Sequence, residues 1–261
     1  MIDLFSLNNK VILISGGAGH LGSAMTEGFL EFGAKVYIAS RNINKSKKFV
    51  SKLKEQGLVN VEAIEMDVTD SKSVHNAVTF ILDREKKIDV LVNNAYSGKT
   101  GSLLTGEEQD WMNSFNSSIH ATYRLTKAVL PTMLEQKKGH IINISSMYGL
   151  VSPNQEIYGD SLQNSPPHYG AAKAGMVQFT RYIAGHFAKD GIIANCIAPG
   201  PFPSEQTQKN EKFIAKLSEK TPTGRIGKPD ELKGIAILLA SDASSYINGQ
   251  TISVDGGWTA W

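Results

Sequence analysis

Short, continuous apolar runs alternate with helical patterns along nearly the whole chain, and this alternation constrains the fold more than any other feature. Strands are predicted at residues 11–14, 35–39, 61–66, 90–92, 141–144, 192–197 and 251–254. Helices are predicted at 21–32, around 49–53, and at 74–82, 111–134, 171–188, 205–217 and 232–239. Strands that are apolar on both faces and separated by helices form parallel sheets covered on both sides. The sequence therefore predicts a single α/β domain over residues 1–261, with a doubly wound parallel sheet of about seven strands.

A glycine-rich segment follows the first predicted strand, where sheets of this kind bind their ligands. Gly17, Gly19 and Gly22 form a G-x-G-x-x-G pattern between the strand and a helix. Glycines permit a tight turn and a close approach of a pyrophosphate, and the helix N-terminus offers free N–H groups to the phosphates. The pattern predicts a dinucleotide site, and an ordinary glycine-rich turn is the alternative.

The residues after the second predicted strand indicate which dinucleotide binds. Ser40, Arg41 and Asn42 stand there, and no acidic residue is present to hydrogen-bond the 2′-hydroxyl of NAD. Arg41 carries a planar guanidinium that suits a phosphate. We therefore expect NADP(H) in preference to NAD(H), with a solvated surface charge at Arg41 as the alternative.

Composition and charge argue against several classes of protein. The 27 Lys and Arg residues nearly balance the 25 Asp and Glu residues, so we expect no basic stripe for nucleic acid. No run of about 18 apolar residues is present to span a membrane. The single cysteine, Cys196, forms no intrachain disulfide and provides no thiolate zinc site alone. The first residues lack the regions of a secretory signal, so we expect a cytoplasmic protein. The motifs of the chain imply no metal.

Five further motifs follow one another along the chain. They are Asn93-Asn94-Ala95, Ser146, Tyr169 with Lys173, Asn195 to Pro199-Gly200, and Val254-Asp255-Gly256-Gly257. With the glycine-rich segment, the set resembles the short-chain dehydrogenase/reductase family of standard length, from about Val11 to Gly257. The resemblance implies a Rossmann-like fold and a hydride transfer between a nicotinamide cofactor and a carbonyl or alcohol substrate.

Tyr169 and Lys173 have the spacing of an acid/base pair, since residues four apart share one face of a helix. A nearby ammonium group, together with the positive charge of oxidised nicotinamide, favours tyrosinate and lowers the pKa of Tyr169. Tyr169 is therefore expected to exchange a proton with the substrate, and Ser146 to hydrogen-bond the reacting oxygen. A surface tyrosine and lysine, and a serine that caps a strand end, are the alternatives.

The resemblance also implies a set of cofactor contacts, in which Lys173 holds the nicotinamide ribose. The expected cofactor-binding residues are Gly16, Gly17, Gly19, His20, Leu21, Gly22, Ser40, Arg41, Asp67, Val68, Asn93, Ala95, Tyr169, Lys173, Pro199 and Gly200. A homo-oligomer, either a tetramer or a dimer, is implied as well, since relatives are often tetramers built on the two long helices after the fourth and fifth strands.

Three residues depart from the family pattern. His20 stands where a loop glycine is usual, Tyr96 replaces a glycine, and Ser118 replaces the asparagine of a proton relay. Ser118 is expected to hold a relay water with its hydroxyl. The glycine spacing itself resembles that of longer, epimerase-like members. A catalytically silent dinucleotide-binding protein and a sugar epimerase or dehydratase are therefore the alternative functions.

Two segments are expected to line the substrate pocket: 147–168, about ten residues longer than in most relatives, and 200–220, an expected lid. The first is rich in Asn, Gln, Tyr and Ser, which suit a polar, sugar-like small molecule. The candidate substrate contacts are Ser146, Tyr148, Tyr96, Tyr158 and Phe202. The insertion resembles a bacterial subset associated with flagellin and surface-polysaccharide sugar modification. A surface loop or an oligomer contact is the alternative.

Overall fold

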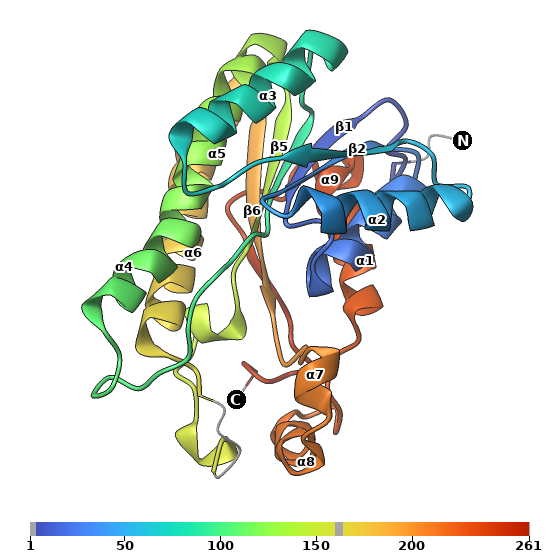
Figure 1. Cartoon of the computed structure of the whole chain (residues 1–261). Coiled ribbons are helices and arrows are strands. Elements are labelled where there is room, and N and C mark those ends of the chain that lie inside the picture. Colours follow the sequence, from blue (N-terminus) through green and yellow to red (C-terminus); the bar gives the residue numbers. More distant parts are fainter. Residues whose placement is uncertain (1–3, 160–163, 261) are drawn as a thin grey trace.

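The computed structural model describes residues 4–159 and 164–260, and it confirms the predicted parallel sheet (Figure 1). Seven strands are hydrogen-bonded in the order β3-β2-β1-β4-β5-β6-β7, and all neighbours are parallel. They are β1 (Val11–Ser15), β2 (Lys35–Ser40), β3 (Val61–Glu65), β4 (Val90–Asn93), β5 (Gly139–Ile144), β6 (Ile192–Pro199) and β7 (Thr251–Val254). The strand order reverses between β1 and β4, which is where open sheets of this kind place their ligand crevice.

Helices cover both faces of the sheet, as Figure 1 shows. One face carries α3 (Ser71–Glu85), α5 (Ile119–Gln136) and α6 (Pro167–Phe187), and the other carries α1 (His20–Glu31), α2 (Ile43–Glu55) and α9 (Lys233–Ala240). Successive strand residues point to opposite faces. In β1, Leu13 packs in the core beneath α3 and α5, while Ile12 and Ile14 pack beneath α1. Both faces of the strand are buried, which explains its continuous apolar run.

Two of the predicted helices are interrupted in the structure. The prediction of one helix over 111–134 is wrong, because α4 (Glu108–Ser117) ends before Ser118, whose φ of −114° and ψ of −96° are not helical. The prediction of one helix over 205–217 is also wrong. There α7 (Glu205–Gln208) stops, and α8 (Glu211–Lys220) starts anew at Asn210, whose side chain accepts a hydrogen bond from a backbone N–H of α8.

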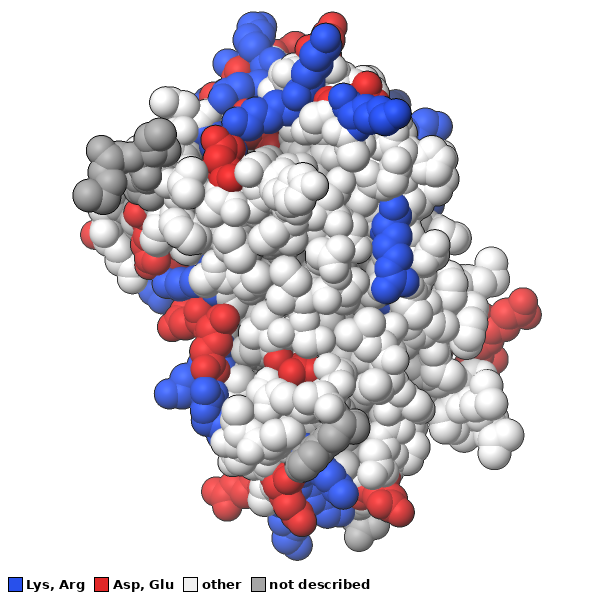
Figure 2. All heavy atoms as spheres, turned by 180° about the vertical axis from the view of Figure 1, so that it is seen from behind, with Lys and Arg blue, Asp and Glu red and all other residues white. Residues whose placement is uncertain are grey.

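The described residues contain no helix that is both long and apolar enough to cross a membrane. Figure 2 shows the face behind the view of Figure 1, where charged side chains gather at the top, at the bottom and along the left edge, and the middle holds few of them. Lys and Arg side chains form no continuous stripe over the described residues of that face.

Candidate functional site

A cleft of about 570 Å³ opens beyond the carboxyl ends of β1, β2, β4 and β5. Ten of the expected cofactor-binding residues line it: Gly16, Gly19, His20, Leu21, Ser40, Arg41, Val68, Ala95, Tyr169 and Lys173. Six others do not line it: Gly17, Gly22, Asp67, Asn93, Pro199 and Gly200. The ten expected residues that line the cleft come from five separate parts of the chain.

The glycine-rich turn between β1 and α1 is shaped by close backbone contacts. Gly16 has a φ of +68°, which L side chains rarely adopt. A Cβ added at Gly22 would collide with the carbonyl oxygen of Gly16 and lie 2.9 Å from the Cα of Gly17. A Cβ at Gly17 would lie 2.7 Å from the side chain of Ile14. Gly17 and Gly22 therefore allow the turn to close, although neither lines the cleft.

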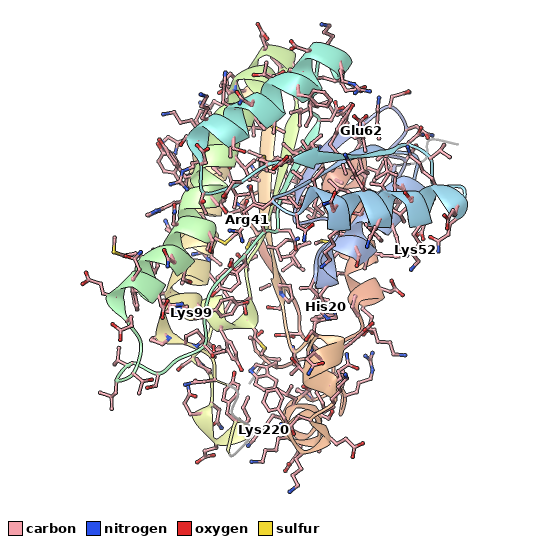
Figure 3. All side chains as sticks on the ribbon, in the orientation of Figure 1. His20, Arg41, Lys52, Glu62, Lys99 and Lys220 are labelled. Carbon is pink, nitrogen blue, oxygen red and sulfur yellow. The ribbon has the colours of Figure 1, made fainter. Side chains whose placement is uncertain are left out.

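Two cations flank the cleft beyond β2. Arg41 and Lys45 are both exposed and both line it, while the hydroxyls of Ser40 and Ser46 lie 2.7 Å apart beside them. Figure 3 shows Arg41 between the layer of α5 and α6 and the layer of α1 and α2, and His20 at the start of α1. Lys45 was missed by sequence reasoning, because it stands among many other polar residues of α2. Its position one turn after Arg41 is the signal that would have found it.

Asp67 shapes the loop after β3 instead of lining the cleft. Its Oδ1 accepts hydrogen bonds from the backbone N–H of Thr69, at 2.8 Å, and from the Thr69 hydroxyl, at 2.7 Å. Burial opposes ionisation of Asp67, but these hydrogen bonds and the charges of Arg41 and Arg124 hold its pKa below the usual value. The turn brings Val68 and Thr69 to the cleft wall.

Asn93, an expected cofactor contact, lies within the sheet. It is buried, and its Nδ2 donates to Oδ1 of Asn143 on the neighbouring strand, at 2.8 Å. The next residue, Asn94, lines the cleft instead, and its Nδ2 donates to the carbonyl oxygens of Ser15 and Gly16, both at 3.0 Å. Asn94 thus ties the end of β4 to the glycine-rich turn, a role that sequence reasoning missed although the residue belongs to the quoted motif.

Ser146, Tyr169 and Lys173 come together where β5 ends and α6 begins. Ser146 and Tyr169 share a side-chain hydrogen bond. The Nζ of Lys173 lies 5.7 Å from the centroid of the Tyr169 ring and donates to the carbonyl oxygen of Ile144 at 2.7 Å. The predicted constellation is therefore present at one end of the sheet, beside the cleft.

Burial dominates the pKa values of this group in the protein alone. Burial raises the pKa of Tyr169 to about 12, against the lowering effect of the hydrogen bond with Ser146. Burial lowers the pKa of Lys173 to about 8, with a smaller raising effect from Cys196. The predicted lowering of the pKa of Tyr169 depends on the charge of oxidised nicotinamide as well as on Lys173; in the protein alone, desolvation disfavours the charged form of each group and dominates.

Three tyrosines gather near the reactive group. The ring of Tyr96 packs edge-to-face on Tyr169, with centroids 5.0 Å apart. The hydroxyls of Tyr148 and Tyr158 lie 3.0 Å apart, and Tyr158 stacks on Phe213 of α8 with centroids 5.5 Å apart. Segment 147–168 therefore contacts segment 200–220. Residues 160–163 of the predicted substrate loop lie outside the described residues.

Ser118 and Phe202 also lie outside the cleft lining, as do Pro199 and Gly200. The Ser118 hydroxyl is buried and donates to the sulfur of Met176, at 3.4 Å, while its neighbour Ser117 lines the cleft. Pro199 is buried as the last residue of β6, and a Cβ added at Gly200 would lie 2.5 Å from the Cα of Asp255. A Cβ added at Gly227 would likewise lie 2.5 Å from the Phe202 ring. The Phe202 ring therefore packs beneath a neighbouring turn.

The described residues were also compared with the requirements of a metal site, and the polar groups of the cleft with those of an organic ligand. No group of three or more His, Cys, Asp or Glu side chains there is arranged to hold a metal ion. The polar groups of the cleft are hydroxyls, amides, ammonium and guanidinium groups and the imidazole of His20, which suit an anionic, hydroxyl-bearing ligand.

Comparisons with known proteins cover almost the entire chain. A family model described as enoyl-(acyl carrier protein) reductase matches residues 16–259. A 3-oxoacyl-acyl-carrier-protein reductase of Thermotoga maritima is 34% identical over 255 residues, 96% of this chain and 98% of that protein. A 5-keto-D-gluconate 5-reductase of Escherichia coli K12 is 35% identical over 260 residues, 98% of each chain.

A solved structure is similarly close. The crystal structure of a gluconate 5-dehydrogenase from Burkholderia cenocepacia, in complex with NADP and tartrate, superimposes with a TM-score of 0.90 at 31% sequence identity. The match covers 99% of this chain and 98% of that one. The similarity therefore extends over the sheet, the cleft and the segments that flank it.

Proposed function

Because the chain belongs to the short-chain dehydrogenase/reductase family, we propose that its cleft transfers a hydride between NADP(H) and a polar, sugar-like ketone or alcohol. The protein is an NAD(P)-dependent oxidoreductase by family membership. The observation that carries the proposal is the meeting of Ser146, Tyr169 and Lys173 beside a glycine-lined cleft.

The residues of the cleft fit NADP(H). The first N–H groups of α1 have no side-chain cap at Gly19, so they are available to a pyrophosphate. Arg41 and Lys45 would hold the 2′-phosphate, since an NAD-specific site would place a carboxylate there. The hydride itself is supplied by the nicotinamide ring when the cofactor is bound.

In the reducing direction, Tyr169 gives its phenolic proton to the carbonyl oxygen of the substrate. Its raised pKa keeps it protonated at neutral pH, which suits this acid role. Ser146 orients the same oxygen by a hydrogen bond. Lys173 stabilises the tyrosinate that forms, because an ammonium group nearby favours the charged phenolate.

Ser118 is proposed as the residue that holds a relay water behind this pair. Its hydroxyl is directed to Met176, one turn of α6 beyond Lys173. The relay therefore requires the hydroxyl to turn back toward Lys173, which a serine can do by rotating about one side-chain bond.

The substrate class follows from the hydroxyl groups of the cleft and from the relatives. Tyr96, Ser97 and Ser117 line the cleft close to the acid/base pair. Hydroxyls of this kind bind the hydroxyls of a sugar acid better than an acyl chain. Two of the relatives are named for gluconate or its keto form. We therefore favour a keto-sugar acid over an acyl thioester, with segments 147–168 and 200–220 around it.

The test is NADPH oxidation by the purified protein, with 5-keto-D-gluconate and an acetoacetyl thioester as alternative substrates. Tyr169→Phe should lower turnover by about 10²- to 10⁴-fold, the usual contribution of a general acid. Cofactor binding without turnover of any carbonyl would indicate the silent dinucleotide-binding alternative. Isomerisation of a sugar without net cofactor oxidation would indicate the epimerase.

We also propose that the chain forms a homo-oligomer in the cytoplasm. β7 is the last strand of the sheet in the described residues, and an exposed strand edge favours pairing or coverage. The weakly charged middle of the face in Figure 2 is compatible with such contact. Light scattering coupled to size-exclusion chromatography distinguishes a tetramer or dimer from a monomer.

A further inference from the structure

Tyr96 contacts both members of the acid/base pair. Its ring centroid lies 5.0 Å from that of Tyr169, and the two ring planes are inclined at 67°. The same ring lies 5.4 Å from the Nζ of Lys173, within the range of a cation–π interaction. The Tyr169 ring lies 5.7 Å from that nitrogen. The ammonium group therefore has two aromatic rings within cation–π range.

The Tyr96 side chain is held in this position from two directions. Its hydroxyl lies 3.2 Å from the Oγ of Ser114, which is buried on α4. On the other side, the backbone of Gly98 passes so close that an added Cβ would lie 2.8 Å from the Cζ of Tyr96. The ring is thus fixed by α4 and by its own loop, and it differs from a freely rotating surface tyrosine.

Lys173 needs such a partner because its surroundings disfavour a charge. It is 3% exposed, and its Nζ donates a hydrogen bond to the carbonyl oxygen of Ile144. Within residues 4–159 and 164–260 it forms no ion pair with a carboxylate. The titratable groups that act on the pair are Tyr96, Tyr148, Tyr158 and Cys196. An aromatic ring face supplies electron density without adding a charge.

We propose that Tyr96 is a positioning residue of this reaction, whose ring face stabilises the ammonium form of Lys173 and whose ring packing fixes the ring of Tyr169. A glycine at this position would have no ring to contact Lys173 or Tyr169. The inference rests on the proposed function, because it assigns Tyr96 a role in that same proton transfer. Ser114 contributes by orienting the ring through its hydrogen bond.

The experiment compares Tyr96→Leu and Tyr96→Met, which lack a ring face, with Tyr96→Phe, which keeps it. Each protein is labelled with ¹³C at the lysine ε-carbon, and the Lys173 resonance is assigned by its loss in Lys173→Met. The Leu and Met variants should titrate at Lys173 about one pH unit below the wild type, since a desolvated cation–π contact is lost. Their kcat should fall about tenfold at pH values above the new midpoint, where Lys173 is neutral, with KM changed less.

Tyr96→Phe should retain the wild-type Lys173 titration, and Ser114→Ala is the matched control for the lost hydroxyl contact. An unchanged Lys173 titration in both Tyr96→Leu and Tyr96→Met overturns the proposal, as does a loss confined to KM with an unchanged pH profile. The Tyr169→Phe variant in the same assay separates the two claims. If it keeps full turnover, the proposed function itself fails, whatever Tyr96 does.

Discussion

The Nε2 of His20 lies 3.1 Å from the carbonyl oxygen of Phe202, and this hydrogen bond joins the first turn of α1 to the segment that precedes α7. His20 lines the cleft, whereas Phe202 lies in the expected lid, residues 200–220. The carbonyl oxygen only accepts, so Nε2 carries the hydrogen. The start of α1 and segment 200–220 are therefore connected directly.

Removing this connection should weaken cofactor binding modestly. We expect His20→Ala to raise the Kd for NADPH about three- to tenfold, since a hydrogen bond of this kind contributes about 0.5–1.5 kcal/mol. His20→Gln, whose amide can still donate to the carbonyl, serves as the control. Fluorescence titration gives the Kd values, and equal values for His20→Ala and the wild type would refute the coupling.

Cofactor choice should depend on the two cations beyond β2. Arg41→Ala should raise the Kd for NADPH about 10- to 100-fold and leave that for NADH nearly unchanged, because charge-assisted hydrogen bonds contribute about 1.5–3 kcal/mol. Lys45→Ala should act in the same sense and more weakly. Lys52, exposed on the same helix and not part of the cleft lining, provides the matched control as Lys52→Ala. A parallel loss of NADH affinity would contradict the assignment.

The sequence predicted which segments meet at the cleft better than it predicted the contacts between them. The glycine turn and Arg41 were found because each follows directly from a strand end, a local feature of the sequence. The contact of Tyr96 with Lys173 joins residues 77 positions apart in the sequence, and no local sequence pattern predicts it. The same holds for Asn94, whose role depends on the closeness of β1 and β4.

Helix breaks were the main error of the fold prediction. The apolar pattern continues through Ser118 and hides the backbone turn there, which is fixed by packing against α6. Asn210 did offer a local signal, since asparagine is a strong helix N-cap. The class of sheet, by contrast, could be predicted from the sequence, but the order of its strands could not. The pairing of β1 with β4 depends on tertiary structure and not on a local pattern.

The glycine turn should tolerate no side chain at Gly22. Gly22→Ala should lower the free energy of unfolding by about 1–3 kcal/mol, as overpacking does, and should weaken NADPH binding because the turn must open.

Gly185, on α6, has no neighbouring atom within 4 Å of an added Cβ. Gly185→Ala should therefore stabilise the protein by about 0.4–1 kcal/mol. Urea unfolding measures both, and a neutral Gly22→Ala would show that the turn adapts.

The free energy of unfolding should decrease as the pH is lowered from about 6.5, because of His140. This residue is buried, its Nδ1 donates to the carbonyl oxygen of Leu239 at 3.0 Å, and burial lowers its pKa to about 4. Between these two values the unfolded chain binds a proton that the folded chain does not. The free energy of unfolding should therefore decrease by about 1.4 kcal/mol per pH unit, or about 3 kcal/mol in total.

The matched variants for this effect are His140→Asn, which keeps a donor but does not titrate, and His75→Gln, which removes an exposed histidine. Unfolding in urea at several pH values should show a shallower dependence in His140→Asn and an unchanged one in His75→Gln. The same slope in all three proteins would assign the acid sensitivity to other groups.

The all-parallel sheet also determines how the chain can fold. A hairpin brings two strands together across a short turn, but the seven described strands form no antiparallel pair, so each pairing must wait for a crossover connection. Val11 pairs with Lys35, and Ile12 must then find Val90. Strands that are apolar on both faces remain exposed during this search. Refolding from denaturant should accordingly be slow and lose yield as protein concentration rises, although helices cover both faces of the finished sheet.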